Sequence, residues 1–436
     1  MANDGLPGSG AASTALLTDQ YELTMLQAAL ADGSADRRCT FEVFARRLQH
    51  GRRYGVVAGV ERVLQAVRDF RFDEAALEHL APVLDRATLD HLADWRFDGD
   101  IDGYPEGQLY FPGSPVMTVT GSFGSAVILE TVVLSILNHD CAIASAAARM
   151  TSAAAGRTLI EMGSRRTHES AAVAAARAAY IAGFTATSNL AAGQRWGIPT
   201  TGTAAHAFTL LHDSEAAAFA AQAATLGQGT TLLVDTYDIT RGIATAVEVV
   251  GTDLGAIRID SGDLGVLARA AREQLDDLGA TGTKIVLSGD LDEYGIAALR
   301  ADPVDVYGVG TSLVTGSGVP TAGMVYKLVQ VDGRPVAKRS ENKQSSGGAK
   351  GALRRHRATG TATEEVVYQL SGPAPQAQPG DVALQVPMMR AGERVSGAEP
   401  LDAARERLRA ALVTLPWEGL TLSQGDPTIP TTVLSA

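Results

Sequence analysis

Apolar and polar positions follow two alternating periods between residues 156 and 312. Short apolar runs end in acidic, serine or glycine positions, and most are followed by a segment with the 3.6-residue period of a helix. This succession of strand, polar turn and helix predicts βαβ units around a buried parallel sheet. Seven segments are candidate strands: RTLIEMG, GFTATS, IPTTGTAAH, TTLLVDTYD, GAIRIDSGDL, TKIVLSGDLDE and VDVYGVGTS.

This array predicts an α/β fold. Seven strands are close to the eight of a complete barrel, so the pattern favours an irregular, incomplete parallel α/β barrel, with an open doubly wound sheet as the alternative. We expect the barrel to occupy residues 126–323 and to begin with a long apolar helix from about Val127 to Met150. The carboxyl ends of parallel strands meet on one face, which holds the active site in barrels.

The flanking segments, residues 1–125 and 324–436, contain shorter β-like runs broken by glycine and proline. Neither segment has enough apolar sequence for a core of its own, so we expect both to build one β-rich second domain. The first segment also predicts a helix that contains Tyr21. Asp19 and Glu22 have the spacing of a capping box at its start, and Gly33 follows its end.

Composition and charge narrow the class of protein. A net charge of −12 over 436 residues disfavours binding to nucleic acid or to anionic membranes, although local anion sites stay possible. Only two cysteines, Cys39 and Cys141, fit a reducing compartment. The N-terminus lacks the features of a secretory signal, and the most apolar run, AVILETVVLSIL, is shorter than the about 20 residues of a membrane span. We therefore expect a cytoplasmic protein.

Two strand ends carry candidate chemistry. His206 follows the strand-like TGTAAH, where it suits a general base or a nucleophile, or a structural hydrogen bond. Arg258 and Asp260 are two residues apart in RIDSGDL and so share a face of their strand. The arginine suits a substrate carboxylate, and the aspartate suits positive charge on a sugar ring. An internal ion pair between the two is the alternative interpretation.

Glycine-rich turns follow two of the later strands, and two common nucleotide motifs are missing. SGDLDE and GVGTS place glycines ahead of helices, where backbone N–H groups bind phosphate well. The sequence has no GxxxxGK[ST] and no GxGxxG that opens a first βα unit, which disfavours a Walker-type ATPase and a dinucleotide dehydrogenase. The segment QLDDLGATGTK predicts a helix that ends at Gly279 rather than an acidic phosphoribosyl pyrophosphate loop.

Nine motifs together resemble those of nicotinate phosphoribosyltransferase, from about Leu16 to Arg355. In order they are TDQYELTM, FEVFARR, EMGSRR, TSNLAAG, GTAAH, VDTYD, RIDSGDL, SGDLDE and GVGTS. The resemblance implies an enzyme of NAD salvage that joins nicotinate to 5-phosphoribosyl 1-pyrophosphate, giving nicotinate mononucleotide and pyrophosphate. It also implies coupling to ATP hydrolysis, a requirement for Mg²⁺, and a homodimer with active sites at the subunit interface.

The resemblance also implies roles for individual residues. His206 would be phosphorylated by ATP, Tyr21 would stack on the pyridine ring, and Asp235 and Asp260 would lie near the ribose and the reaction centre. The substrate-binding residues are then Arg258, Thr203 and Ser188 for nicotinate, Gly289, Asp290, Gly310 and Thr311 for ribose and the 5-phosphate, and Arg165 on the phosphate side. The metal ligands stay unassigned.

Three departures from the family pattern bear on these roles. Met162 stands where an aromatic residue is usual, and SSGGAK replaces a Pro-Gly-Lys pattern within the basic segment 340–355. Ser188 stands where nicotinamide-using relatives carry an aspartate, and a neutral residue there favours an anionic ring substituent. A nicotinamide or quinolinate phosphoribosyltransferase, and a non-catalytic homologue that binds nucleotide, are the alternatives.

Overall fold

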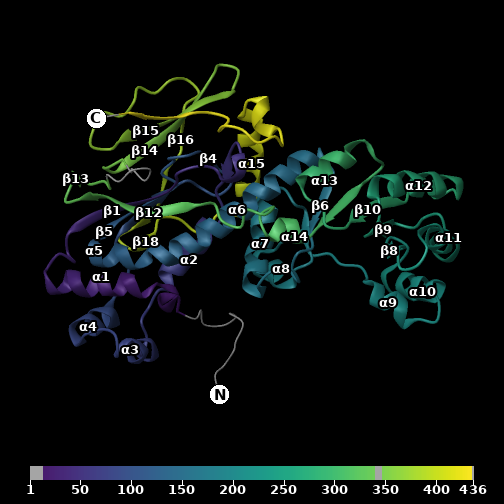
Figure 1. The fold of residues 1–436 in the computed structure, drawn as a ribbon, viewed down its shortest axis with the longest axis horizontal. Helices are drawn as coiled ribbons and strands as arrows, with labels where there is room; N and C mark the ends of the chain where they lie inside the picture. The colour runs from purple at the N-terminus through teal and green to yellow at the C-terminus, as the bar shows by residue number, and fades with distance from the viewer. Residues whose placement is uncertain (1–12, 339–345, 435–436) are drawn as a thin grey trace. The chain divides into compact units, whose positions relative to one another are not determined.

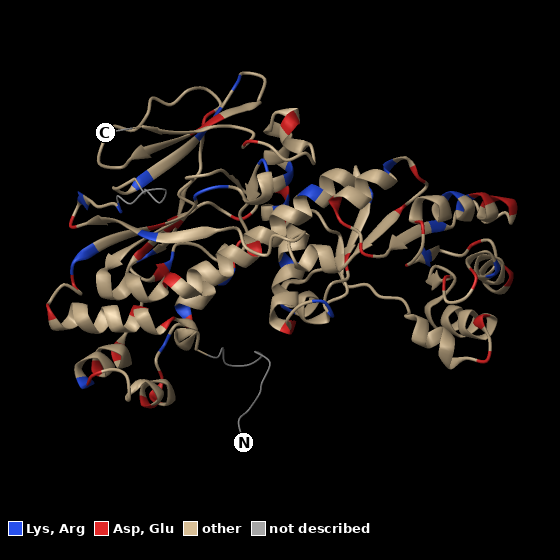
Figure 2. Cartoon of the chain, viewed as in Figure 1, with Lys and Arg blue, Asp and Glu red and all other residues tan. Residues whose placement is uncertain are grey.

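The computed structural model describes residues 13–338 and 346–434, whose course is shown in Figure 1. The chain forms two compact units. One runs from Ile143 to Pro320, and the other combines the segments up to Ala142 and from Thr321 onward. Figure 2 shows that acidic and basic residues are spread over the helices and loops of both units, although the net charge is −12.

The unit from Ile143 to Pro320, all of which the structure describes, is built on a six-stranded parallel sheet. The strand order is β7-β6-β11-β10-β9-β8, so the last strand in sequence pairs with the first. The strands are β6 (Thr158–Glu161), β7 (Ala186–Thr187), β8 (Thr231–Leu233), β9 (Ala256–Ile259), β10 (Lys284–Ser288) and β11 (Val306–Val309). The helices are α7 (Glu169–Ile181), α8 (Leu190–Trp196), α9 (His206–Leu211), α10 (Glu215–Leu226), α11 (Ile239–Val250), α12 (Leu264–Asp277), α13 (Glu293–Ala298) and α14 (Thr311–Val314).

The predicted strand IPTTGTAAH, residues 198–206, is not a regular strand. Only Thr200 of that segment pairs, in a single parallel bridge with Thr187 at the end of β7. Pro199 has no N–H to donate, and Gly202 adds no side chain that could pack on a sheet, so the pairing stops there. The sheet is therefore open, with β7 and β8 as its two edge strands. The helix predicted from QLDDLGATGTK is confirmed as the last part of α12.

The other unit contains a seven-stranded antiparallel sheet of order β13-β12-β1-β5-β3-β17-β18 in the described residues. Strands from the N-terminal segment form its centre and strands from the C-terminal segment form both edges, because β12 pairs with β1 and β17 pairs with β3. A four-stranded sheet, β16-β14-β15-β19, and a pair, β2-β4, accompany it. The strands are β1 (Arg38–Ala45), β2 (Gly55–Val56), β3 (Asp100–Gly103), β4 (Leu109–Tyr110), β5 (Met117–Ser122), β12 (Met324–Val331), β13 (Arg334–Pro335), β14 (Lys350–His356), β15 (Ala362–Gln369), β16 (Val382–Ala383), β17 (Val386–Arg390), β18 (Glu393–Arg394) and β19 (Thr431–Leu434).

Helices α1 (Gln20–Ala31), α2 (Val60–Arg68), α3 (Glu74–Leu80), α4 (Arg86–Asp94), α5 (Phe123–Ala126) and α15 (Leu401–Thr414) belong to this unit. The predicted capping box of α1 does not form. The side chain of Asp19 makes no capping hydrogen bond. Glu22 is instead fully buried and accepts hydrogen bonds from Thr18, 2.6 Å away, and from the backbone N–H of Thr131, 3.0 Å away. Burial raises the pKa of this carboxyl group, despite those hydrogen bonds.

The basic residues of the segment 340–355 are held in the fold where the structure describes them. Residues 339–345 lie outside the described part of the chain. From Lys350 onward the segment is strand β14, and Lys350 forms a buried ion pair with Glu42 of β1 at 2.7 Å. Arg354 forms another with Glu365 of β15, also at 2.7 Å. These basic residues therefore neutralise buried carboxylates.

Helix α6 (Glu130–Ala154) spans the boundary between the units and follows a short 3₁₀ turn. It extends four residues beyond the predicted end at Met150. The continuous helical stretch 123–154 is long and apolar enough to cross a membrane, but 61% of its most apolar window is buried inside the protein. Burial of this kind is typical of a core helix, so the apolar composition is explained by packing.

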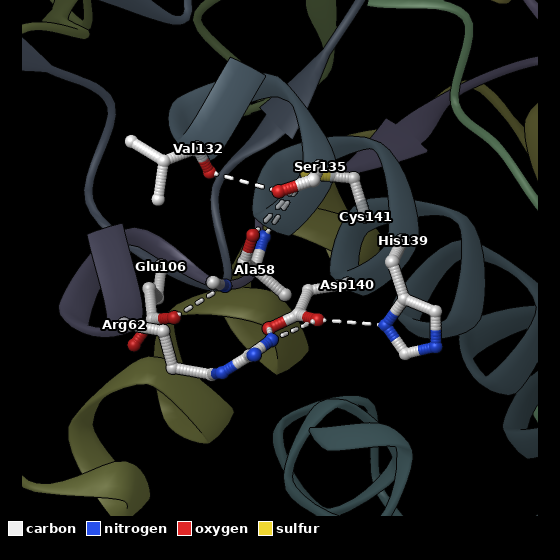
Figure 3. A network of polar contacts seen from close by, with 9 residues as sticks. Ala58, Arg62, Glu106, Val132, Ser135, His139, Asp140 and Cys141 are labelled. Carbon is white, nitrogen blue, oxygen red and sulfur yellow. Dashed lines mark hydrogen bonds and ion pairs between the residues drawn. The ribbon is translucent and has the colours of Figure 1, made fainter. Parts of the chain in front are cut away.

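A buried acidic residue of α6 ties α2 to this helix (Figure 3). Asp140 is 1% exposed and accepts two hydrogen bonds from Arg62 at 2.7 and 2.8 Å. His139 contacts the same carboxylate at 2.8 Å. Burial opposes ionisation of Asp140, but Arg62 and His139 outweigh it, so the pKa lies below its ordinary value. The ionised carboxylate is thus part of the stable packing between α2 and α6.

We expect Asp140→Asn to lower the free energy of unfolding at pH 7 by about 2–3 kcal/mol, because it removes charge-assisted hydrogen bonds. The pKa of Asp140 is depressed in the folded state, so the unfolded chain binds the proton more readily and this stabilisation is lost as pH falls below about 4. Urea titrations at pH 7 and at acidic pH measure both effects. Acid-induced loss of stability should be smaller in Asp140→Asn than in wild type, and an equal loss would contradict the prediction.

Candidate functional site

Each of three neighbouring βα turns contains two aspartates with different tasks. The first lies at the end of a strand, and the second caps the following helix. The capping residues are Asp238, Asp263 and Asp292, whose carboxylates accept hydrogen bonds from backbone N–H groups in the first turns of α11, α12 and α13. This leaves Asp235, Asp260 and Asp290 at the ends of β8, β9 and β10, as the strand pattern predicts.

Asp235 lies between two other predicted site residues, Asp260 and His206. Its side chain is 1% exposed, and its Oδ2 accepts hydrogen bonds from the backbone N–H of Asp260 at 2.8 Å and from the hydroxyl of Ser261 at 2.9 Å. Its Oδ1 is buried and has no hydrogen-bond partner among the described residues. That oxygen lies 3.9 Å from Nε2 of His206, whose Nδ1 lies 3.1 Å from the hydroxyl of Thr236.

Arg258 and Asp260 form the ion pair that the sequence left as an alternative. Nη2 of Arg258 donates to Oδ1 of Asp260 at 3.0 Å. Both side chains remain partly accessible, 14% and 31% exposed. Burial raises the pKa of Asp260, but the Ser288 hydrogen bond and then Arg258 lower it more, so the net pKa is below its ordinary value. The pair is therefore charged, and it faces solvent-accessible space.

The turn after β10 depends on glycine. Gly289 has φ of +133°, and a Cβ atom there would lie 2.6 Å from the carbonyl oxygen of Asp260. Asp290, the next residue, adopts φ of +49°, in the left-handed region that non-glycine residues rarely occupy. Strained backbone of this kind brings the turn against the end of β9 and presents Asp290 at the same edge.

Two cavities open along these strand ends. The wider one, about 850 Å³, continues from the carboxyl ends of the strands past Ile160 and Val286 to residues near their amino ends, such as Thr231 and Lys284. The narrower one, about 120 Å³, is predominantly polar. Met162, Arg165 and Arg258 line both cavities. The other predicted site residues in these walls are Ser188 and Thr203 in the wide cavity, and Asp260, Gly289, Asp290, Gly310 and Thr311 in the narrow one.

A buried glutamate that the sequence analysis did not single out supports one wall. Glu161, at the end of β6, is 1% exposed and accepts hydrogen bonds from the hydroxyl of Thr187 and the backbone N–H of Gly163. Burial raises the pKa of Glu161. Its own carbonyl oxygen accepts from the N–H of Ser188 at 2.8 Å. Glu161 thus joins the turn that carries Arg165 to the end of β7 that carries Ser188.

Three further residues of the narrow cavity were missed, Arg166, Ser288 and Gly308. The register of β9 and β10 could have indicated Ser288, since it pairs Ile259 with Leu287 and places the next residues, Asp260 and Ser288, side by side. Arg166 directly follows Arg165 in the EMGSRR motif. With Arg165 and Arg258 it makes three guanidinium groups around one small cavity, which suits an anion.

Tyr21 belongs to the other unit and lies on α1 with 46% of its surface exposed. Burial of part of the side chain and the nearby Glu130 raise its pKa to about 12, so the phenol is neutral at physiological pH. Within the described residues, no group of three or more histidine, cysteine, aspartate or glutamate side chains could by itself hold a metal ion.

The chain resembles known proteins in both sequence and fold. A sequence profile of the nicotinate phosphoribosyltransferase N-terminal domain matches residues 16–138. The crystal structure of human nicotinic acid phosphoribosyltransferase has a TM-score of 0.82 at 27% identity, covering 96% of this chain and 98% of that one. The nicotinate-nucleotide pyrophosphorylase of Pyrococcus furiosus has a TM-score of 0.79 at 23% identity, which is a likeness of fold.

The curled parallel sheet, its strand-end site and the β-rich unit therefore define a phosphoribosyltransferase of mixed α/β fold. The chain is also 66% identical to nicotinate phosphoribosyltransferase pncB1 of Mycobacterium tuberculosis, over 97% of this chain and 95% of the relative. It is 31% identical to the human nicotinate phosphoribosyltransferase, over 86% and 83% of the two chains. The chain belongs to the nicotinate phosphoribosyltransferase family.

Proposed function

We propose that this enzyme transfers the 5-phosphoribosyl group of 5-phosphoribosyl 1-pyrophosphate to nicotinate, on an incomplete α/β barrel, with ATP hydrolysis coupled through His206. The observation that carries the proposal is that the two cavities share Arg258 in their walls. A flat anionic ring in the wide cavity and a phosphorylated sugar in the narrow one would meet beside this guanidinium. Nicotinate and the phosphoribosyl donor have those shapes and charges.

The binding roles follow from the chemistry of each wall. Arg258 supports the nicotinate carboxylate, with the hydroxyls of Ser188 and Thr203 as neutral donors and acceptors around the ring. The turns at Gly289–Asp290 and Gly310–Thr311 offer backbone N–H groups and a carboxylate to ribose and the 5-phosphate. Arg165 lines both cavities and would contact the pyrophosphate of the donor.

The reaction is a displacement at the anomeric carbon of ribose. The pyridine nitrogen forms the new C–N bond as the C–O bond to pyrophosphate breaks, and pyrophosphate departs with the bonding electrons. The ribose ring becomes cationic in the transition state. The ionised carboxylate of Asp260, held in the polar cavity, stabilises that charge, and Asp235 supports the Asp260 backbone through its 2.8 Å hydrogen bond.

The donor set in the narrow cavity also fits Mg²⁺. Asp290 supplies a hard oxygen donor in its wall. Mg²⁺ is commonly held by one or two carboxylates together with substrate phosphates, so no preformed cluster of three acidic residues is needed. When bound, the ion would neutralise charge on the departing pyrophosphate.

His206 suits phosphoryl transfer from ATP. If Nε2 keeps its proton, facing Oδ1 of Asp235 at 3.9 Å, Nδ1 carries the lone pair that attacks, once the Thr236 hydroxyl that lies 3.1 Å from it turns away. The N–P bond then forms as the bond to the γ-phosphorus of ATP breaks, and ADP leaves. Asp235 stabilises the positive charge that the imidazole gains, and its unpartnered Oδ1 is consistent with this part-time role. Hydrolysis of the phosphohistidine returns the enzyme to its starting state.

We expect His206→Ala to abolish the stimulation of nicotinate mononucleotide formation by ATP while leaving some ATP-independent product. The assay measures product from nicotinate, phosphoribosyl pyrophosphate and Mg²⁺, with and without ATP. His212→Ala is the matched control, because its ring contacts Phe208 rather than an aspartate. ATP stimulation that persists in His206→Ala would overturn the coupling mechanism.

The same assay separates the alternatives in substrate. Turnover of nicotinamide or quinolinate in place of nicotinate would identify a sister transferase, and no turnover of any of the three would favour a nucleotide-binding homologue. We further propose a cytoplasmic homodimer in which Tyr21, exposed on α1, stacks on the pyridine ring of a neighbouring subunit. Loss of nicotinate affinity in Tyr21→Ala with an unchanged oligomeric state would support that role.

A further inference from the structure

One buried hydroxyl group connects the two charged residues at the centre of the site. Ser288, the last residue of β10, is 4% exposed. Its Oγ accepts a hydrogen bond from Nε of Arg258 at 2.7 Å and donates one to Oδ1 of Asp260 at 2.5 Å. A hydroxyl has one proton and two lone pairs, so the proton is committed to Asp260 and the serine is poorly placed to bind substrate itself.

The hydrogen bonds leave one edge of the Arg258 guanidinium available. A guanidinium has five N–H donors in a plane. The Nε–H is used by Ser288, and one N–H of Nη2 is used by Asp260, so the side-on edge is occupied. The end-on edge, formed by Nη1 and the second N–H of Nη2, is left for a planar carboxylate, which it can bind in a bidentate manner.

We propose that Ser288 is a positioning residue for the transfer reaction, which fixes the Arg258 guanidinium and the Asp260 carboxylate relative to each other. This inference rests on the proposed function of the site. Without the hydroxyl, Nε of Arg258 loses its acceptor. The guanidinium is then free to turn its end-on edge away from the part of the wide cavity proposed to hold the nicotinate ring. Arg258 then binds the carboxylate on the pyridine ring less tightly.

Ser288 also affects the charge of Asp260. Burial raises the pKa of Asp260, and the hydrogen bond from Ser288 is the largest of the contributions that lower it. Removal of the hydroxyl therefore moves this pKa upward. Other charged groups face the same carboxylate or line the same cavity, namely Arg258, His206, Asp235, Arg165, Arg166 and Asp290.

The test is the Ser288→Ala enzyme, assayed with nicotinate and phosphoribosyl pyrophosphate over a range of pH. We expect KM for nicotinate to rise about tenfold, because a hydrogen bond to a charged group is worth at least about 1.5 kcal/mol and 1.4 kcal/mol is a factor of ten. We also expect the acidic limb of the kcat/KM profile to move to higher pH. A purely structural serine would alter thermal stability without moving that limb.

Two variants control the interpretation. Ser288→Thr keeps the hydroxyl, and the β10–β11 register pairs position 288 with Gly308, which has no side chain. We expect it to restore the wild-type KM and pH profile. Ser152→Ala removes a hydroxyl that bonds only within α6, to the carbonyl oxygen of Ala148, and should change neither quantity.

The outcomes distinguish this inference from the proposed function. A wild-type enzyme that forms no nicotinate mononucleotide overturns the proposed function. An active wild type with an unchanged KM and pH profile in Ser288→Ala overturns the positioning role alone. If the alanine variant does not fold, Ser288→Thr decides. A threonine variant that folds but has a raised KM and a displaced acidic limb also overturns the inference, because the hydroxyl is present.

Discussion

Asp260→Asn is expected to lower kcat/KM for nicotinate mononucleotide formation by about 100- to 1,000-fold, the usual cost of removing one preorganised electrostatic partner of a transition state. Asparagine has nearly the same shape as aspartate but carries no charge. The ribose ring gains positive charge only as the bond to pyrophosphate breaks. We therefore expect kcat and kcat/KM to fall together, with little change in the affinity for the phosphoribosyl donor.

Asp263→Asn is the matched control for this prediction. Asp263 lies in the same turn, but it caps α12 through a hydrogen bond from the N–H of Val266 at 3.2 Å. Asparagine caps a helix about as well as aspartate, so neither stability nor activity should change appreciably. Steady-state kinetics of both variants measure the difference. If kcat/KM falls by less than about fivefold in Asp260→Asn, this carboxylate does not take part in the catalytic step.

Glu365→Ala is expected to lower the free energy of unfolding by about 3–5 kcal/mol, since it leaves a buried arginine without its counter-charge. The side chains of Arg354 and Glu365 are 3% and 0% exposed. Glu365 also accepts hydrogen bonds from the hydroxyls of Tyr104, at 2.7 Å, and Ser114. Urea unfolding followed by circular dichroism measures the loss.

The same hairpin supplies a matched control in Glu364→Ala. Glu364 pairs with Arg355 at 3.6 Å, and those two side chains are 31% and 20% exposed. A partly exposed pair of this kind contributes at most about 1 kcal/mol. The double variant Arg354→Met/Glu365→Leu should recover part of the stability lost in Glu365→Ala. Equal losses in Glu364→Ala and Glu365→Ala would refute the special cost of the buried pair.

Much of the site could be predicted because its residues lie at regular places in a βα array. Arg258 and Asp260 were predicted to share a face by strand alternation, and they form an ion pair. The local sequence pattern also correctly predicted the α/β fold and helix α12. The predicted strand 198–206 is wrong because a threonine-rich segment meets the local requirements of a strand but has no partner strand beyond the bridge at Thr200.

What the sequence did not predict depends on contacts between distant residues. Glu22 has the spacing of a capping box, but its carboxylate bonds to Thr131, 109 positions away. Ser288 looks like ordinary turn punctuation until the β9–β10 register places it beside Asp260. Lys350 and Arg354 belong to a basic segment that the sequence does not explain, and only the fold supplies the buried carboxylates that they neutralise. Short-range periodicity carries no information on such partners.

The pairing of β1 with β12, and of Glu42 with Lys350, has a consequence for synthesis on the ribosome. Glu42 and Lys350 are 308 positions apart. At about 5–20 residues per second, the ribosome needs about 15–60 s to make that stretch. The segment from Ile143 to Pro320 is complete before Lys350 has been made, whereas the first 142 residues still lack β12 and their buried counter-charge. During that interval the nascent chain exposes an unpaired strand edge, so chaperones have most to protect at its N-terminal end.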